Sequence, residues 1–176
     1  MGFFDKLFGG KSKDENTAKF TNQSKTVLTP LQGKVLAQAD IPDETFAQGI
    51  LGPGCGIEPT GDTVYAPFDG TVTQIATTLH AVGITSNDGI ELLIHVGIDT
   101  VSMGGDGFEL HVKEGDRVRR GDPLITFDLD KIRAAGHPTV TAFLVTEPGD
   151  ASIDFHTGID AAAGETVVMH YSGVQS

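Results

Sequence analysis

A chain of 176 residues and 18.5 kDa has room for one domain with a substantial hydrophobic core, and too little for two large ones. Its 39% hydrophobic and 20% charged residues are ordinary for a globular protein and exclude a coiled coil or a wholly disordered chain. The net charge of −12 argues against a nucleic-acid partner, because binding to a phosphate backbone needs a basic surface.

The first 25 residues differ in charge from the rest. They hold five lysines against three acidic residues, whereas residues 26–176 hold seven basic and 21 acidic groups. Near the start, four apolar side chains fall on one face of a helix: Phe3, Phe4, Leu7 and Phe8. We therefore predict a flexible, basic, amphipathic leader and linker over residues 1–25, a domain over 26–176, and weak association of residues 1–10 with an anionic membrane. A leader that touches nothing is the alternative.

The chain carries no apolar run near the ~20 residues that a membrane span needs, and its start lacks the features of a secretory signal. We therefore expect a cytoplasmic protein, peripheral at the membrane if the leader binds there. The single cysteine, Cys55, cannot form an internal disulfide. Its position between two glycines favours a small, buried, apolar role over a reactive one.

Short apolar runs rich in Val, Ile, Thr and Phe alternate with turn sequences along the rest of the chain. They predict strands at 26–37, 63–75, 81–85, 90–96, 108–112, 123–127, 139–145 and 166–171. Only residues 129–135 predict a helix. The pattern indicates an all-β fold, an antiparallel sandwich or a barrel-like sheet with at most one or two short helical turns.

Two of the six histidines, His80 and His95, flank the turn Asn87-Asp88-Gly89. A two-residue loop in this hairpin places them either directly opposite, with Cβ atoms about 5 Å apart, or diagonally on one face, about 7–8 Å apart. Only a three-residue loop or a bulge would separate them. The other histidines are expected to have isolated surface or structural roles: His111, His137, His156 and His170.

The neighbours of this pair add to its chemistry. Thr78 precedes His80 by two residues and should face the same side, where its hydroxyl can fix an imidazole tautomer. Gly97, just beyond the apolar run that ends at His95, is expected to let another molecule approach. A purely structural pair of hydrogen-bonded histidines is the simplest alternative.

Three chemistries fit a histidine pair. Zinc hydrolysis has support in the spacing of His95 and Asp99, but nothing in the sequence completes its ligand set. A swinging-arm carrier is suggested by the turns at 114–118 and 121–124, but the lysine at a hairpin tip is missing. The third is phosphoryl transfer through a nucleophilic histidine, in which a second imidazole and a hydroxyl offset charge on the phosphoryl oxygens.

The segment 89–101 (GIELLIHVGIDTV) and the following GDGF at 105–108, with matches at 30–33 and 66–72, resemble the glucose-family IIA component of the bacterial phosphoenolpyruvate-dependent sugar phosphotransferase system. The resemblance extends over 29–168, and the start of the chain is similar to the leader of free-standing members. It implies that His95 is phosphorylated at Nε2 by the small phosphocarrier protein HPr and passes the group to a cysteine of a permease IIB domain. It also implies that His80 serves onward transfer and that Thr78 orients it.

The resemblance further implies a partner-binding ring. Asp43 and Asp99 match acidic residues that flank the site, where they suit docking with a cationic partner better than contact with a phosphate. The apolar members of the ring are Phe46, Ile50, Leu51, Leu93 and Val96. No cofactor is required, although some members hold zinc between the two histidines, here His80 and His95, and a partner's carboxylate. In these members the unphosphorylated form inhibits permeases and glycerol kinase, so a regulatory binding protein is the alternative function.

Overall fold

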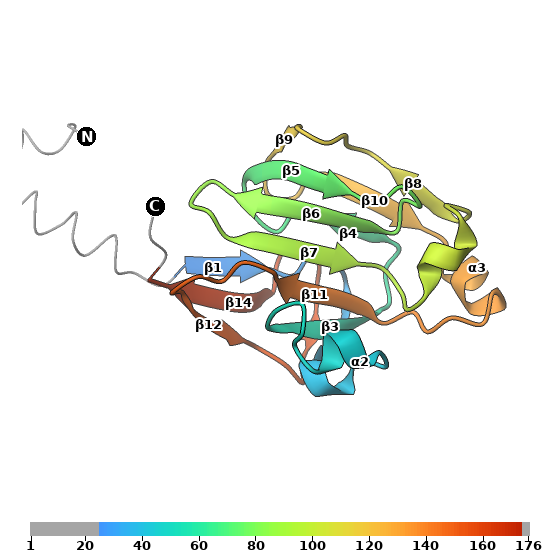
Figure 1. Cartoon of the computed structure of the whole chain (residues 1–176), viewed down its shortest axis with the longest axis horizontal. Coiled ribbons are helices and arrows are strands. Elements are labelled where there is room, and N and C mark those ends of the chain that lie inside the picture. The colour runs from blue at the N-terminus through green and yellow to red at the C-terminus, as the bar shows by residue number, and fades with distance from the viewer. Residues whose placement is uncertain (1–24, 174–176) are drawn as a thin grey trace, which may run out of the picture.

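The computed structural model describes residues 25–173, which fold into antiparallel sheets (Figure 1). The largest sheet has eight strands, in the order β13 (Asp160–Ala161), β2 (Gly33–Ala37), β3 (Gly54–Pro59), β11 (Thr141–Val145), β7 (Glu91–His95), β6 (Ala81–Ser86), β5 (Gly70–Ile75) and β9 (Arg117–Val118). Two three-stranded sheets complete the body, in the orders β1 (Lys25–Leu28), β14 (Val167–Ser172), β12 (Ser152–Phe155) and β4 (Thr63–Tyr65), β10 (Pro123–Phe127), β8 (Phe108–Leu110). The predicted all-β, antiparallel fold is confirmed.

Helical structure within residues 25–173 is short, as expected. The α-helices are α2 (Glu44–Ala47) and α3 (Leu129–Ala134), and the 3-10 helices are η1 (Gln38–Asp40) and η2 (Thr100–Met103). Asp128 caps α3 by accepting hydrogen bonds from the backbone N–H groups of the first turn, which explains why the predicted helix at 129–135 forms. No helix in these residues is long and apolar enough to cross a bilayer. The predicted leader falls almost entirely outside the described residues; Lys25 already belongs to β1.

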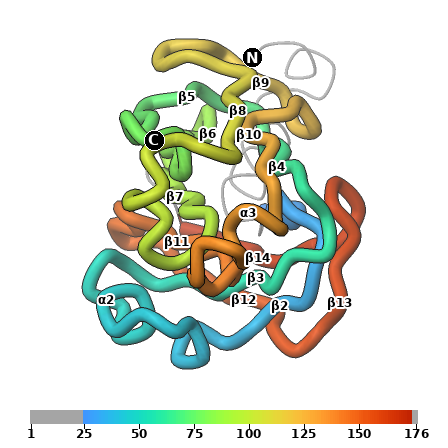
Figure 2. The backbone as a smooth tube through the Cα atoms, turned by 90° about the vertical axis from the view of Figure 1, so that its right-hand side faces the viewer, coloured from blue at the N-terminus to red at the C-terminus, as the bar shows by residue number. Residues whose placement is uncertain are grey.

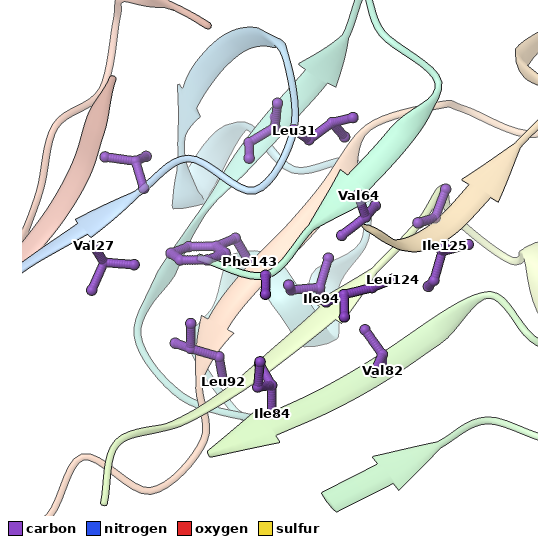
Figure 3. Close-up of a cluster of buried hydrophobic side chains, with 14 of the residues drawn as sticks. Val27, Leu31, Val64, Val82, Ile84, Leu92, Ile94, Leu124, Ile125 and Phe143 are labelled. Atoms are coloured by element: carbon purple, nitrogen blue, oxygen red, sulfur yellow. The ribbon is translucent and has the colours of Figure 1, made fainter. Parts of the chain in front are cut away.

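The hydrophobic core lies between the sheets, and the period-2 alternation of their strands fills it (Figure 3). Leu92 and Ile94 of β7 point into this main core, while Leu93 packs with a smaller apolar cluster on the opposite face. β11 is buried on both faces: Phe143 belongs to the main core and Ala142 to the smaller cluster. The strand that ends at His95 is therefore held from two sides.

Several predicted element boundaries are wrong. The runs at 26–37 and 63–75 are each two strands, interrupted where Pro30 and Pro67 cannot donate a ladder hydrogen bond. The sequence prediction also missed β3, β9, β12 and β13. β3 reads as a turn because of its glycines, yet a Cβ at Gly54 would lie 2.2 Å from the carbonyl oxygen of Phe143, so the close strand contact needs glycine.

Cys55 lies in this missed strand, β3, and its side chain is fully buried in the main core. Desolvation raises the pKa of its thiol to about 12. The thiolate is therefore not populated at neutral pH, and the predicted unreactive role is confirmed.

The β6–β7 hairpin has a three-residue loop, so the predicted two-residue loop is wrong. Ala81, and not His80, is paired with His95 in the ladder. The Ser86 N–H donates to the carbonyl of Ile90 at 2.8 Å, and the loop closes through Gly89, whose φ is +101°. This is the usual form of a three-residue hairpin, a turn followed by a residue in the left-handed region.

Candidate functional site

β7 ends and β6 begins at the same end of the large sheet (Figure 1). The rings of His80 and His95 nonetheless lie together there. Their centroids are 4.6 Å apart and their planes are inclined by 80°. Because the Val96 N–H donates to the His80 carbonyl at 2.8 Å, a regular pleat would place the two rings on opposite faces. His80 instead follows a turn that ends at Leu79, whose φ of 65° is left-handed. This irregular entry into β6 explains why the predicted contact forms without the predicted register.

His95 is held in one tautomer by the backbone. Its Nδ1 lies 2.9 Å from the carbonyl oxygen of Gly97, which can only accept, so Nδ1 carries the proton. Nε2 is left with a free lone pair. Gly97 has a φ of +74°, and a Cβ there would meet the Thr100 side chain at 2.5 Å. The expectation that Gly97 admits another molecule is wrong, because this glycine is buried and serves the turn that aims its carbonyl.

The electrostatics of the pair keep His95 neutral. Burial, followed by the neighbouring His80, lowers the pKa of His95 from 6.5 to about 4, against the opposing effect of the Gly97 carbonyl. Burial also lowers the pKa of His80. At neutral pH, His95 therefore presents an unprotonated nitrogen, as a nucleophile requires.

A hydrogen bond with Thr78 orients the His80 ring. The Thr78 hydroxyl lies 2.8 Å from His80 Nδ1, as predicted from their spacing. The residue is 5% exposed, and its ring lies 6.4 Å from the ring of Phe108, centroid to centroid. Because one ring nitrogen is engaged by a hydroxyl that can donate or accept, His80 can change its protonation state without losing this partner.

α2 covers one side of His95; Figure 2 faces this end of the molecule. The Phe46 ring lies 4.9 Å from the His95 ring, centroid to centroid, at 60°. Asp43 caps α2 by accepting from the Phe46 N–H at 3.2 Å, and its charge partly opposes the lowering of the His95 pKa. Gln38 ties the following loop to the helix by donating to the carbonyls of Phe46 and Gly52, both at 2.9 Å.

Exposed apolar side chains gather on the segments that flank the pair. Among residues 25–173, the exposed large hydrophobic side chains are Ile50 (67%), Leu51 (41%) and Val101 (56%). Ile50 and Leu51 follow α2, and Val101 lies in η2, just after the exposed Asp99. Val101 was missed, because a lone valine in a loop carries no distinguishing sequence signal.

The other apolar members of the predicted ring are less accessible. Leu93 is half-buried, and Phe46 is buried against His95. Val96 is wrongly predicted as a member: it is fully buried in the main core, because consecutive residues at the end of β7 point to opposite faces.

The remaining histidines divide into two kinds. His111 and His137 have the predicted isolated roles, with one side-chain partner each, Thr126 and Ser102. His156 and His170 do not: His156 Nε2 lies 2.9 Å from His170 Nδ1. The sequence-based prediction missed this second pair because it also missed β12, the strand that precedes His156.

Comparison with known proteins identifies the family to which the chain belongs. The family described as "phosphoenolpyruvate-dependent sugar phosphotransferase system, EIIA 1" matches residues 25–151. The chain belongs to this EIIA family. It is 44% identical over 167 residues to the PTS system glucose-specific EIIA component of Bacillus anthracis, covering 94% of this chain and 96% of the relative. It is therefore an EIIA component, a phosphocarrier that acts through a phosphohistidine in the sugar phosphotransferase system.

Two further relatives extend this assignment. The chain is 42% identical over 147 residues to the PTS system mannose-specific EIIBCA component of Corynebacterium glutamicum, covering 84% of this chain and 22% of that one. The solved glucose permease IIA from Mycoplasma capricolum superimposes with a TM-score of 0.77 at 33% identity, covering 84% of this chain and 96% of that one. The EIIA fold therefore occurs both as a chain of this size and as part of a larger one.

The pair offers a metal ion at most two ligands. His95 Nδ1 is committed to the Gly97 carbonyl, which leaves Nε2, and His80 supplies one further nitrogen. Within residues 25–173, no third His, Cys, Asp or Glu ligand atom groups with these two. A tetrahedral zinc site would need ligands from another molecule, so the donor set fits a shared ion and not a resident one.

We predict that His95 titrates with a pKa near 4, measured from its imidazole NMR signals, with His95→Gln to assign them. In His80→Gln the pKa of His95 should rise but stay below 6.5, because burial, the larger cause, remains while the repulsion from a second titrating ring is lost. Between about pH 6.5 and 4 the unfolded chain takes up this proton before the folded one, so the His95 contribution to stability falls as pH falls. A His95 pKa at or above 6.5 in the unaltered protein would contradict this picture.

Proposed function

We propose that His95 accepts a phosphoryl group at Nε2 from phosphorylated HPr and passes it to a cysteine of the IIB domain of a glucose-type permease. The hydrogen bond from His95 Nδ1 to the Gly97 carbonyl carries this proposal, since it leaves Nε2 unprotonated beside a second imidazole. The glucose-specific relative supports the sugar class. No sugar site is needed in this chain, because in this scheme the permease binds the sugar.

In the first transfer, the Nε2 lone pair attacks phosphorus and forms the N–P bond. The bond between phosphorus and its donor atom breaks, and its electron pair stays with the donor. No proton has to leave His95, because Nδ1 keeps its proton and its bond to Gly97 throughout. Rigid positioning of the attacking nitrogen at the end of a doubly packed strand supplies the orientation on which phosphoryl transfer depends.

His80 acts once the phosphoryl group is on His95. Its pKa is lowered by burial in the unphosphorylated protein, whereas a phosphoryl group on the adjacent ring would bring close to two negative charges. That charge raises the His80 pKa, and the imidazolium then stabilises the phosphoryl oxygens during transfer to the IIB cysteine. Thr78 keeps the ring oriented in both states.

We predict that incubation with phosphoenolpyruvate, enzyme I and HPr labels the protein with acid-labile phosphate. His95→Gln should abolish labelling, because the nucleophile is removed. His80→Gln should still accept the group but pass it to the IIB domain at least about tenfold more slowly, because a charge-stabilising group of this kind contributes on this scale. His111→Gln is the matched control and should behave as the unaltered protein. Labelling of His95→Gln at the normal rate would overturn the assignment.

The apolar side chains around the pair form a docking surface for both protein partners. Ile50 and Val101 are the most exposed large hydrophobic side chains in the described part of the chain, and they lie on segments that adjoin the histidines. Asp43 caps α2, the helix before Ile50, and Asp99 immediately precedes η2, which holds Val101; both carboxylates suit basic groups on a partner. An apolar centre with a charged rim is the usual anatomy of a transient protein interface.

Replacing Ile50 with serine should raise the KM for phosphorylated HPr by about tenfold, equivalent to roughly 1.4 kcal/mol of lost contact, while kcat stays unchanged. Val101→Ser should act in the same direction. Glu114→Ser changes an exposed residue beside β9, at the far edge of the large sheet, and should leave KM unaltered. Normal KM values for both variants would show that Ile50 and Val101 do not belong to the docking surface.

The unphosphorylated protein has a second candidate role as a regulator of permeases or glycerol kinase. The two-ligand donor set favours it, because His80 and His95 could share a zinc ion with a carboxylate of such a target. Phosphorylation of His95 would occupy Nε2 and end this contact. Regulation and phosphoryl transfer would then be mutually exclusive states of one site.

The sequence of the leader supports weak binding to an anionic membrane, because four apolar residues within positions 3–8 have helical spacing and five lysines lie within residues 1–25. Deletion of residues 1–24 should lower binding to vesicles that contain anionic lipid, measured by co-sedimentation. Acceptance of phosphate from HPr should stay intact, since the histidine site lies wholly within residues 25–173. Equal sedimentation of the full and shortened chains would refute a membrane role for the leader.

A further inference from the structure

A second group of titratable side chains lies on the three-stranded sheet β1-β14-β12. Asp154 of β12 is paired directly with His170 of β14, so both side chains lie on the same face of the sheet. His156 follows Asp154 by two residues and continues the pairing by donating its N–H to the Val168 carbonyl at 2.8 Å. The register therefore brings an aspartate and two histidines together on this face.

The ligand atoms of the three side chains form a tight cluster. One oxygen or nitrogen from each lies within 4.8 Å of the other two. Asp154 Oδ2 is 3.5 Å from His170 Nε2 and 3.9 Å from His156 Nε2. Ligand atoms bound to one tetrahedral zinc ion at 2.0–2.1 Å are ~3.3 Å apart, so small side-chain movements would bring this set into coordination.

We propose that Asp154, His156 and His170 form a binding site for a divalent transition metal, with Zn²⁺ as the representative ion. Two imidazoles and one carboxylate suit Zn²⁺, Ni²⁺ or Cu²⁺, whereas Mg²⁺ and Ca²⁺ prefer oxygen ligands throughout. Three protein ligands leave one tetrahedral position for water or for a ligand from another molecule. The proposal is independent of phosphoryl transfer at His95.

The backbone beneath the cluster is firmly held. β14 is the central strand of its sheet, and the residues on either side of His170, Met169 and Tyr171, are buried in the main core. β12 is fixed to the same core by Phe155, whose ring lies 6.4 Å from that of Phe143. The ligands therefore need little ordering when a metal binds, which favours affinity.

The site is also accessible. The exposed fractions of the side chains are 68% for Asp154, 36% for His156 and 38% for His170, so a hydrated ion can reach all three. The carboxylate offsets the charge of the ion. Within residues 25–173, no carboxylate forms a comparable ligand group with His80 and His95. The alternative use of the cluster is a hydrogen-bond chain, in which one histidine donates to the other and His170 faces the carboxylate.

Zinc binding to the full chain, measured by calorimetry, tests the proposal. The double variant His80→Gln/His95→Gln removes the other histidine pair and should retain one zinc site. On that background, His170→Gln and His156→Gln should each weaken binding by more than about tenfold, because loss of a ligand costs at least as much as loss of a residue that supports one. The control variant His111→Gln should bind zinc as before, because His111 hydrogen-bonds to Thr126 and does not belong to this cluster.

Amide NMR spectra of the same background variant locate the ion. Zinc should shift signals of β12 and β14 around Phe155 and Tyr171, and the same concentration of Mg²⁺ should not. Circular dichroism checks that each ligand variant is folded. If a histidine variant unfolds, Asp154→Asn replaces it, because this change removes a ligand charge at an exposed position. Unchanged affinity in both histidine variants, or shifts confined to β6 and β7, would overturn the proposal and leave the cluster as a hydrogen-bond chain.

Discussion

The hydrogen bond from His95 Nδ1 to the Gly97 carbonyl is the constraint on which the site depends. It fixes the tautomer, with the proton on Nδ1 and the lone pair on Nε2. It requires the left-handed turn at Gly97, where a Cβ would collide with Thr100. It also requires a strand that cannot shift, and the double packing of β7 and β11 supplies this. The large sheet thus holds one nitrogen atom in place for the transfer proposed at His95.

Burial gives this arrangement its reactivity at neutral pH. An exposed imidazole is partly protonated near neutrality, and the protonated form cannot attack phosphorus. Desolvation and the neighbouring ring lower the His95 pKa to about 4, so essentially the whole population is competent. The same burial lowers the pKa of His80, which leaves the pair uncharged until a phosphoryl group arrives. In the proposed transfer, the phosphoryl group supplies the charge that makes a cationic His80 favourable.

The sequence was sufficient to predict the all-β class, the helix at 129–135 and the contact between His80 and His95. It was insufficient for their register, because the left-handed Leu79 that redirects His80 is an ordinary leucine in the sequence. β3 escaped prediction for a related reason: its glycines admit a neighbouring strand rather than mark a turn. Local propensity identifies residues that prefer strands, whereas these features arise from close contact between segments far apart in the chain.

The two histidine pairs show how surroundings decide what the same side chain does. His80 and His95 are desolvated and lie against Phe46 and Phe108, which favours neutral rings and nucleophilic attack. His156 and His170 lie on an exposed sheet face beside Asp154, and a carboxylate next to two imidazoles favours a bound cation over a transferred anion. A phosphoryl group would be repelled there. Among residues 25–173 no carboxylate groups with His80 and His95, so a metal ion between β6 and β7 would need its charged ligand from a partner. Phosphoryl transfer at the first pair and metal binding at the second therefore use different side chains, whereas a zinc ion shared with a partner at His80 and His95 would exclude the phosphoryl group.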